Sequence, residues 1–112
     1  MNAAAIDGAI LALSHPARRE LLRLCVGGER SAGELGDLVR LRQPATSQHL
    51  RVLRDAGLLT VRKDGNRRLY RVHFERLDQV RAALNGLWSS RLLALKRAAE
   101  ERARGRSRVR PK

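Results

Sequence analysis

The stretch SAGELGDLVRLRQPATSQHLRVLRDAGLLTVRKDGNRRLYRV, residues 31–72, decides the fold of this chain. It opens on Ser31, with Glu34 three residues later, which is the pattern of a capping box at a helix N-terminus. Apolar residues at helical spacing then supply a buried stripe: Leu35, Leu38 and Val39. We therefore predict a short helix that ends at a break around residues 40–42.

A second helix is predicted from Gln43 to Ala56, because Pro44 is tolerated in a first turn and Gly57 fits a C-terminus. At 100° per residue, four positions fall within about 60° of one another and form a buried seam: Thr46, Leu50, Leu53 and Gly57. The other side of the helix carries a polar set: Pro44, Ser47, Gln48, Arg51 and Asp55.

Two β-prone runs follow directly, at residues 58–63 and 67–72, with apolar residues at alternate positions. Asp64-Gly65-Asn66 lies between them and favours a turn, so the pair predicts a β-hairpin. A short helix pair followed at once by a hairpin is the plan of a winged helix-turn-helix.

The flanking sequence predicts further helices. A short helix contains Ile6, Ile10 and Leu13, and a second runs from Pro16 to about Val26. A long last helix is expected over about 75–102, with one apolar face: Leu77, Val80, Leu84, Leu87, Trp88, Leu92 and Leu95. The predicted fold is mainly α with a β-hairpin wing, about five helices in the order α-α-α-α-β-β-α. Residues 1–104 are expected to form one folded domain, and 105–112 a basic disordered tail.

Positive charge is concentrated in segments. The chain of 112 residues has 24 Lys and Arg against 11 Asp and Glu, a net charge of +13. Counted along the sequence, residues 1–39 carry −1, 40–56 carry +3, 60–73 carry +4 and 96–112 carry +6. Patches of this kind indicate a polyanion partner, whereas a merely solvated surface would spread the charge evenly.

Several classes of protein are disfavoured. One cysteine, Cys25, cannot form a disulfide within the chain, and on an apolar helical face it is expected to be a small buried residue. No Ser/His/Asp or Cys/His constellation and no phosphate loop indicates an enzyme, and no cofactor is implied. No run is long enough for a membrane span, and the N-terminus lacks a basic segment. The simplest interpretation is a reduced, cytoplasmic protein.

Duplex DNA is the partner that the helix and hairpin suit. Gln can pair with adenine and Arg with guanine in the major groove, and Ser can contact bases or phosphate. We expect DNA contacts from the second helix of the pair at Gln43, Pro44, Thr46, Ser47, Gln48, His49 and Arg51. We expect wing contacts at Arg62, Lys63, Asn66, Arg67 and Arg68. His49 lies at the edge of the seam, which favours a structural or phosphate role, and Tyr70 is expected to pack against the helices.

Residues 31–72, together with HPARRELLRLC at 15–25, resemble the ArsR family of winged-helix repressors. Gln43-Pro44, Ser47, His49-Leu50 and Val52-Leu53-Arg54 sit where that family has its recognition-helix signature, and Asp55-Ala56-Gly57-Leu58 matches its step into the wing. The resemblance implies a homodimer that binds an inverted repeat, with residues 1–104 as the domain for DNA binding and dimerisation. It also implies an interface formed by the first and last helices, at Ile6, Ile10, Leu84, Leu87, Trp88, Leu92 and Leu95.

The sequence departs from the family at its metal sites. Residues 34–39 contain no cysteine pair, and the last helix contains no histidine, so we expect no metal and no metal sensing. A small-molecule effector is compatible with the sequence but is not identified by it. Two alternatives stay open at this point: a non-specific architectural DNA-binding protein and a winged helix that binds only protein.

Overall fold

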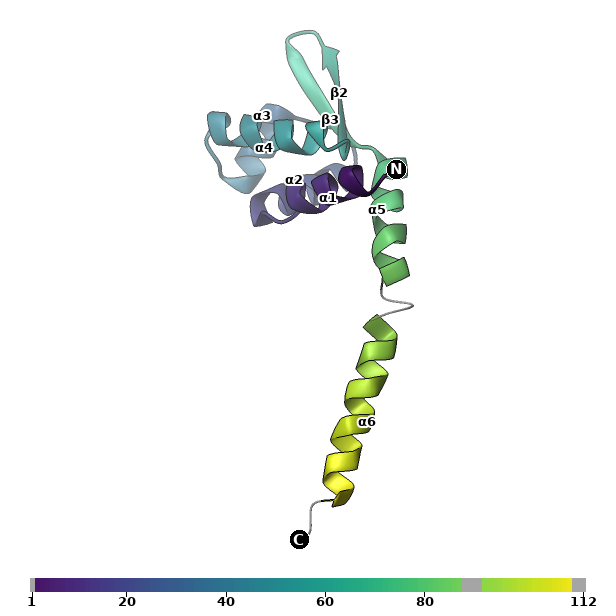
Figure 1. Cartoon of the computed structure of the whole chain (residues 1–112). Coiled ribbons are helices and arrows are strands. Elements are labelled where there is room, and N and C mark those ends of the chain that lie inside the picture. Colours follow the sequence, from purple (N-terminus) through teal and green to yellow (C-terminus); the bar gives the residue numbers. More distant parts are fainter. Residues whose placement is uncertain (1, 88–91, 110–112) are drawn as a thin grey trace. The chain divides into compact units, whose positions relative to one another are not determined.

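A computed structural model describes residues 2–87 and 92–109, with side chains at all of these except 87 and 106–109. The chain divides into two units, residues 1–80 and 81–112, and each is described by itself. The elements are α1 (Ala3–Ala12), α2 (Pro16–Val26), β1 (Arg30–Ser31), α3 (Ala32–Val39), α4 (Gln43–Asp55), β2 (Leu59–Asp64), β3 (Arg67–Val72), α5 (Phe74–Leu87) and α6 (Leu93–Val109) (Figure 1).

The start of α3 confirms the predicted capping box. The Ser31 hydroxyl oxygen accepts a hydrogen bond from the Glu34 backbone N–H at 3.2 Å, and the Glu34 carboxylate accepts one from the Ser31 N–H at 3.4 Å. The helix ends at Arg40, whose backbone is left-handed with φ 59°. The break predicted around residues 40–42 is therefore confirmed, and it separates α3 from α4.

The end of α4 is a Schellman turn. The Gly57 N–H donates to the Arg54 carbonyl at 2.9 Å, and the Leu58 N–H donates to the Leu53 carbonyl at 3.0 Å. Gly57 has φ +80°, which only glycine adopts without steric cost. Leu53 and Leu58 are both fully buried, so an apolar contact accompanies the turn and directs the chain from α4 into the wing.

The wing is an antiparallel hairpin in which Val61 faces Tyr70 and Asp64 faces Arg67. This confirms the predicted hairpin. A third strand that the sequence did not predict, β1, pairs with β3, so that the strand order is β1-β3-β2. β1 has only two residues, too few to show an alternating pattern, so it could not be recognised from the sequence.

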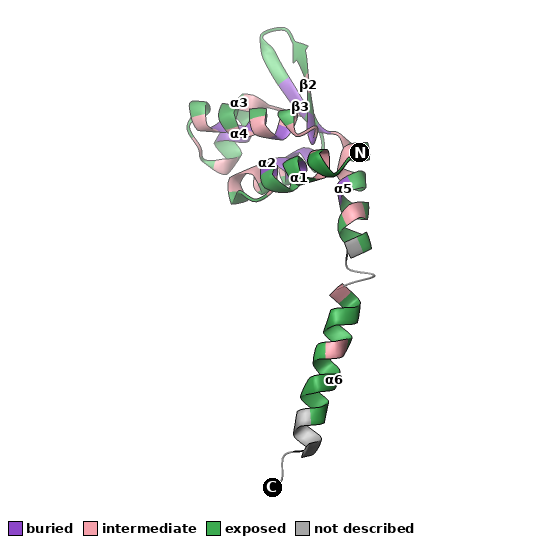
Figure 2. Ribbon diagram, viewed as in Figure 1, coloured by how far each residue is buried: buried purple, intermediate pink, exposed green. Residues whose placement is uncertain are grey.

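The core lies between the helices of the 1–80 unit and the base of the sheet, where buried residues face one another (Figure 2). Leu50 and Leu53 are fully buried, and Thr46 is the one buried polar residue of the described part, so the predicted seam of α4 is confirmed. Tyr70 belongs to the same cluster, as expected, and so does Cys25.

The predicted long last helix differs from the structure in its extent. Helix is described at 74–87 and at 93–109, so the described residues contain six helices, and residues 88–91 lie outside them. α6 passes through Gly105 and continues to Val109, into the segment expected to be a disordered tail. A glycine inside a helix costs only about 1 kcal/mol relative to alanine, which the neighbouring helix formers can offset.

Candidate nucleic-acid interface

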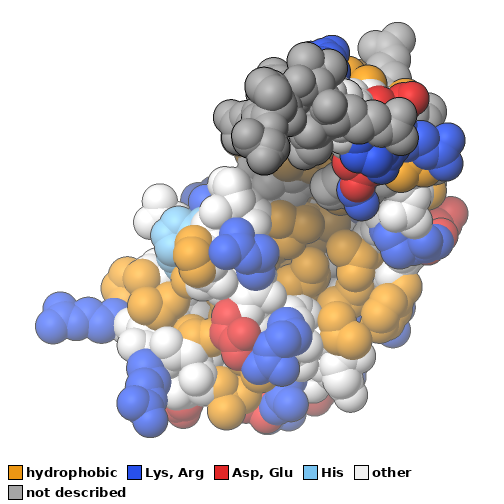
Figure 3. Space-filling model, turned by 90° about the horizontal axis from the view of Figure 1, so that it is seen from below, with side chains coloured by type: hydrophobic (Ala, Val, Ile, Leu, Met, Phe, Trp, Pro, Cys, Tyr) orange, Lys and Arg blue, Asp and Glu red, His pale blue; other side chains and the backbone are white. Residues whose placement is uncertain are grey.

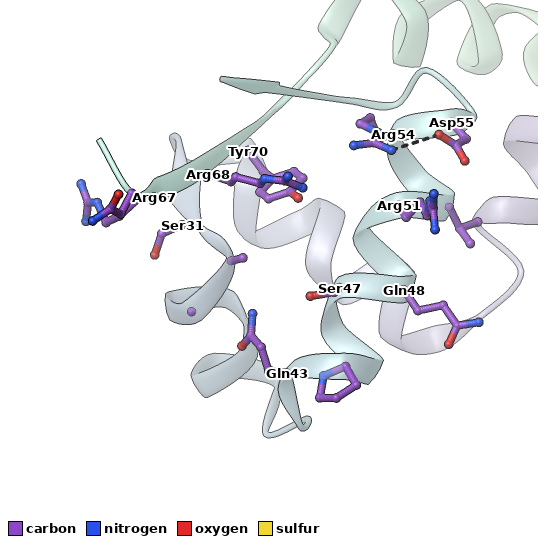
Figure 4. A pocket seen from close by; sticks show the side chains of 15 residues that line it. Ser31, Gln43, Ser47, Gln48, Arg51, Arg54, Asp55, Arg67, Arg68 and Tyr70 are labelled. Atoms are coloured by element: carbon purple, nitrogen blue, oxygen red, sulfur yellow. Dashed lines mark ion pairs between the residues drawn. The ribbon is translucent and has the colours of Figure 1, made fainter. Parts of the chain in front are cut away.

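A cleft of about 1090 Å³ opens between α3, α4 and the wing (Figure 4). It brings together residues from four segments of the sequence: the start of α3, the exposed face of α4, the hairpin turn and β3. The predicted contact residues that line it are Gln43, Pro44, Ser47, Gln48, Arg51, Asn66, Arg67 and Arg68. The sequence therefore predicted most of the residues that α4 contributes to this cleft and some of those that the wing contributes.

The exposed face of α4 carries the base-reading candidates. Gln43, Ser47, Gln48 and Arg51 are all exposed, and within the described residues none of their side chains has a hydrogen bond or ion pair. In Figure 4, Ser47 points into the cleft, and Gln48, the next residue of α4, extends away from its centre. Unpaired polar side chains on one exposed helix are free to bond to a partner without first breaking an internal contact.

Thr46 is a correction to the predicted contact set. Its side chain is fully buried, and its hydroxyl donates to the Arg42 carbonyl at 3.1 Å. The hydroxyl oxygen also lies next to Gly36 of α3, since a Cβ added to that glycine would be 3.2 Å from it. Thr46 therefore joins α4 to α3 and has no side-chain atom to offer DNA.

His49 is half-buried and faces α2 rather than the cleft. Its ring centroid is 4.5 Å from that of His15, and the two planes are tilted by 51°. Burial, and then the charges of His15 and Arg18, lower the pKa of His49. His15 itself caps α2, because its Nδ1 accepts the Ala17 N–H at 3.1 Å. These contacts agree with the structural role expected for His49.

The four cations predicted as wing contacts fall into two groups. Arg62 forms hydrogen bonds at 2.8 Å from Nε and from Nη2 to the two carboxylate oxygens of Glu29, and Arg67 approaches Asp64 at 3.8 Å. Lys63 and Arg68 are exposed and have no ion pair within the described residues. Only the second group is free to meet a phosphate as unpaired charge.

A second, smaller cleft of about 240 Å³ includes a residue that was not among the predicted DNA contacts. Its lining is almost wholly cationic: Arg54, Val61, Arg62, Lys63 and Arg68. Arg54 lies on α4 beside the buried seam, and for that reason the helical wheel did not select it. A long side chain can extend its charged end from such a position to the surface. Arg54 also contacts Asp55, at 3.6 Å.

The residues predicted at a dimer interface are spread over both units. Ile6 is half-buried and Ile10 is exposed in α1, whereas Leu84 in α5 and Leu95 in α6 are exposed. Leu92 is half-buried, the side chain of Leu87 is not described, and Trp88 lies outside the described residues. Figure 3 shows apolar side chains exposed on one face of the molecule, with Lys and Arg around them.

Comparison with known proteins gives the family. Residues 13–62 match the family described as a helix-turn-helix domain. The arsenical resistance operon repressor of Staphylococcus xylosus is 38% identical over 65% of this chain and 70% of its own length. A crystal structure of a possible transcriptional regulator for arsenical resistance has a TM-score of 0.67 and 41% identity over 73% of this chain and 84% of that one.

An ArsR-like transcriptional regulator from Rhodococcus sp. RHA1 has a TM-score of 0.70 and 28% identity, and the match covers 86% of this chain and 93% of that one. The chain belongs to the ArsR family of winged helix-turn-helix transcriptional regulators. ArsR membership makes α3 and α4 the helix-turn-helix and the β2–β3 hairpin the wing. The family is one of DNA-binding transcriptional regulators and not an enzyme class.

The described residues of this ArsR-family chain contain neither a cluster for a metal ion nor a helix that could span a membrane. Within residues 2–87 and 92–109, no three His, Cys, Asp or Glu residues are grouped so that they could hold a metal ion. Over the same residues, none of the helices has the length and apolar character needed to cross a membrane.

Proposed function

We propose that the chain is a homodimeric repressor that recognises an inverted-repeat operator through α4 and holds the DNA backbone through its wing. One observation carries the proposal: Ser47, Gln48 and Arg51 form an exposed, unpaired polar face on α4, beside a wing that supplies unpaired cations. Gln and Arg are the side chains that form bidentate pairs with adenine and guanine. The exposed face of α4 therefore carries side chains that can recognise a base sequence.

Backbone affinity is assigned to the cationic cleft. Arg54 from α4 lines it together with Lys63 and Arg68 from the two strands of the wing. Four cations line this small cleft, and the three that are not paired with Glu29 suit a phosphate group, because each phosphate contact releases counterions and adds to affinity regardless of sequence. Of the contacts predicted from the wing, Lys63, Asn66, Arg67 and Arg68 remain proposed DNA contacts.

The homodimer is supported by exposed apolar side chains at the predicted interface. Ile10, Leu84 and Leu95 are 40%, 39% and 65% exposed in the single chain. A second copy would remove this apolar surface from water. A two-fold dimer presents two α4 helices, and its operator is then an inverted repeat with one half-site for each. This role places the protein with DNA in the cytoplasm and gives it no catalytic task.

Selection of bound duplexes from a random library, with sedimentation of the purified protein, tests the proposal. We expect an enriched inverted repeat and a mass of two chains. Ile10→Asp with Leu95→Asp should give a monomer with weakened binding. Leu11→Asp, which replaces another exposed apolar residue of α1 outside the predicted interface, should not. A library with no enriched sequence would instead indicate the architectural role, and a monomeric wild type would refute the dimer.

A further inference from the structure

An ion pair between Glu29 and Arg62 connects the wing to the segment before β1, in addition to the pairing of β3 with β1 and the packing of Tyr70 in the core. Arg62 Nε donates to one carboxylate oxygen of Glu29 and Arg62 Nη2 donates to the other, both at 2.8 Å. The two residues are 33 positions apart in the sequence. Two parallel hydrogen bonds fix the relative orientation of both groups, which a single contact does not do.

The position of the pair in the sheet shows what it holds. The strand order is β1-β3-β2, so β1 and β2 share no backbone hydrogen bonds. Leu69 on β3 lies between them, facing Arg62 on one side and Ser31 on the other. Glu29 directly precedes β1, so the side chain of Arg62 spans the central strand to reach it. The pair therefore links two strands that are otherwise joined only through β3.

The pair also removes Arg62 from the cations available to DNA. The hydrogen bonds from Arg62, against a smaller opposing effect of burial, lower the pKa of Glu29, so its carboxylate is charged at neutral pH. The charge of Arg62 is thus balanced locally. Lys63 and Arg68 face each other in the register of the same hairpin and have no such partner within the described residues.

We propose that Glu29 and Arg62 are positioning residues, which hold the wing in the orientation that lets its unpaired cations reach the DNA backbone. The proposal rests on the DNA-binding role assigned above. It replaces the direct phosphate contact that the sequence predicted for Arg62. The two possibilities give opposite signs when Glu29 is changed. Loss of a positioning contact weakens binding, whereas release of a cation held back from phosphate strengthens it.

The first test measures affinity and its salt dependence on a mixed-sequence duplex and on the duplex that the wild type selects. Glu29→Gln and Arg62→Gln should each weaken binding by about two- to five-fold, the range for an exposed ion pair, and leave the salt slope near that of the wild type. The exchanged pair, Glu29→Arg with Arg62→Glu, should restore affinity. The control Arg68→Gln should reduce the salt slope by about 0.9.

Tighter binding and a steeper slope for Glu29→Gln, or a weakening by the exchanged pair as large as by Arg62→Gln, would overturn the proposal.

A second readout needs no DNA. Nitrogen-15 relaxation of the Gly65 amide, at the hairpin tip, reports how well the wing is held in the free protein. Its order parameter should fall in Glu29→Gln and Arg62→Gln, recover in the exchanged pair and stay unchanged in Arg68→Gln. An unchanged tip in all variants would refute the positioning role. A wild type that fails to bind DNA would refute the proposed function and leave this measurement valid.

Discussion

Replacing Gly57 with alanine tests how α5 holds the end of the recognition helix α4. Gly57 has φ +80°, and a Cβ built there would be 2.9 Å from Arg76 Nη1 and 3.1 Å from Arg76 Cζ. The guanidinium of Arg76 therefore lies against the C-terminal turn of α4, where a cation interacts favourably with the helix dipole. The His73 backbone N–H donates to the Leu58 carbonyl at 2.9 Å beside it.

The magnitude has two parts. A left-handed alanine costs about 1–2 kcal/mol. Displacing Arg76 from the helix end removes about 0.3–1 kcal/mol more. We therefore expect Gly57→Ala to lower the free energy of unfolding by about 1.5–3 kcal/mol, measured by urea denaturation followed by circular dichroism.

Gly65→Ala is the matched control, because Gly65 has φ +63° with nothing within 4 Å of the added Cβ. It should show the backbone cost alone, about 1–2 kcal/mol. In an Arg76→Ala background the two alanine variants should become nearly equal. If Gly57→Ala lowers the free energy of unfolding no more than Gly65→Ala does in the wild type, Arg76 does not hold the end of α4.

Three further outcomes are expected. Arg40→Gly should raise the free energy of unfolding by about 1 kcal/mol, because glycine adopts the left-handed backbone at φ 59° freely; a lower urea midpoint would contradict this. Burial raises the pKa of the Cys25 thiol to about 11, so folded protein should react with iodoacetamide far more slowly than urea-unfolded protein, and equal rates would show that the thiol is accessible. Because burial and the charges of His15 and Arg18 lower the pKa of His49, the unfolded chain takes up a proton first as the pH falls through 6.5. Stability should therefore decrease as the pH falls through about 6.5, and His49→Gln should reduce this decrease; an identical pH profile would refute it.

Local signals in the sequence predicted the frame of the molecule. The Ser31 capping box, the Gly57 helix end and the Asp64-Gly65 hairpin all depend on residues within a few positions of one another, and the structure has all three. The exposed face of α4 was predicted for a similar reason. Helical periodicity alone separates Leu50, which is fully buried, from Arg51, which is exposed.

Contacts between distant residues could not be predicted in this way. Glu29 and Arg62 meet only because β1 pairs with β3, and a two-residue strand leaves no pattern in the sequence. Thr46 was expected both in the seam and at the DNA, and its full burial beside Gly36 of α3 shows that the whole side chain belongs to the seam. Arg54 reaches the cationic cleft from beside the seam, which a wheel treats as nearly buried.

The most direct test of sequence reading by α4 compares two affinities for one variant. The wild type should bind the duplex it selects much more tightly than a scrambled duplex of equal length. Gln48→Ala with Arg51→Ala should remove most of this ratio, because each bidentate base contact gives about 1–3 kcal/mol of discrimination, or roughly 5- to 150-fold. Lys63→Ala, a wing control, should weaken both duplexes alike. A double variant that keeps the full ratio would contradict base reading by α4.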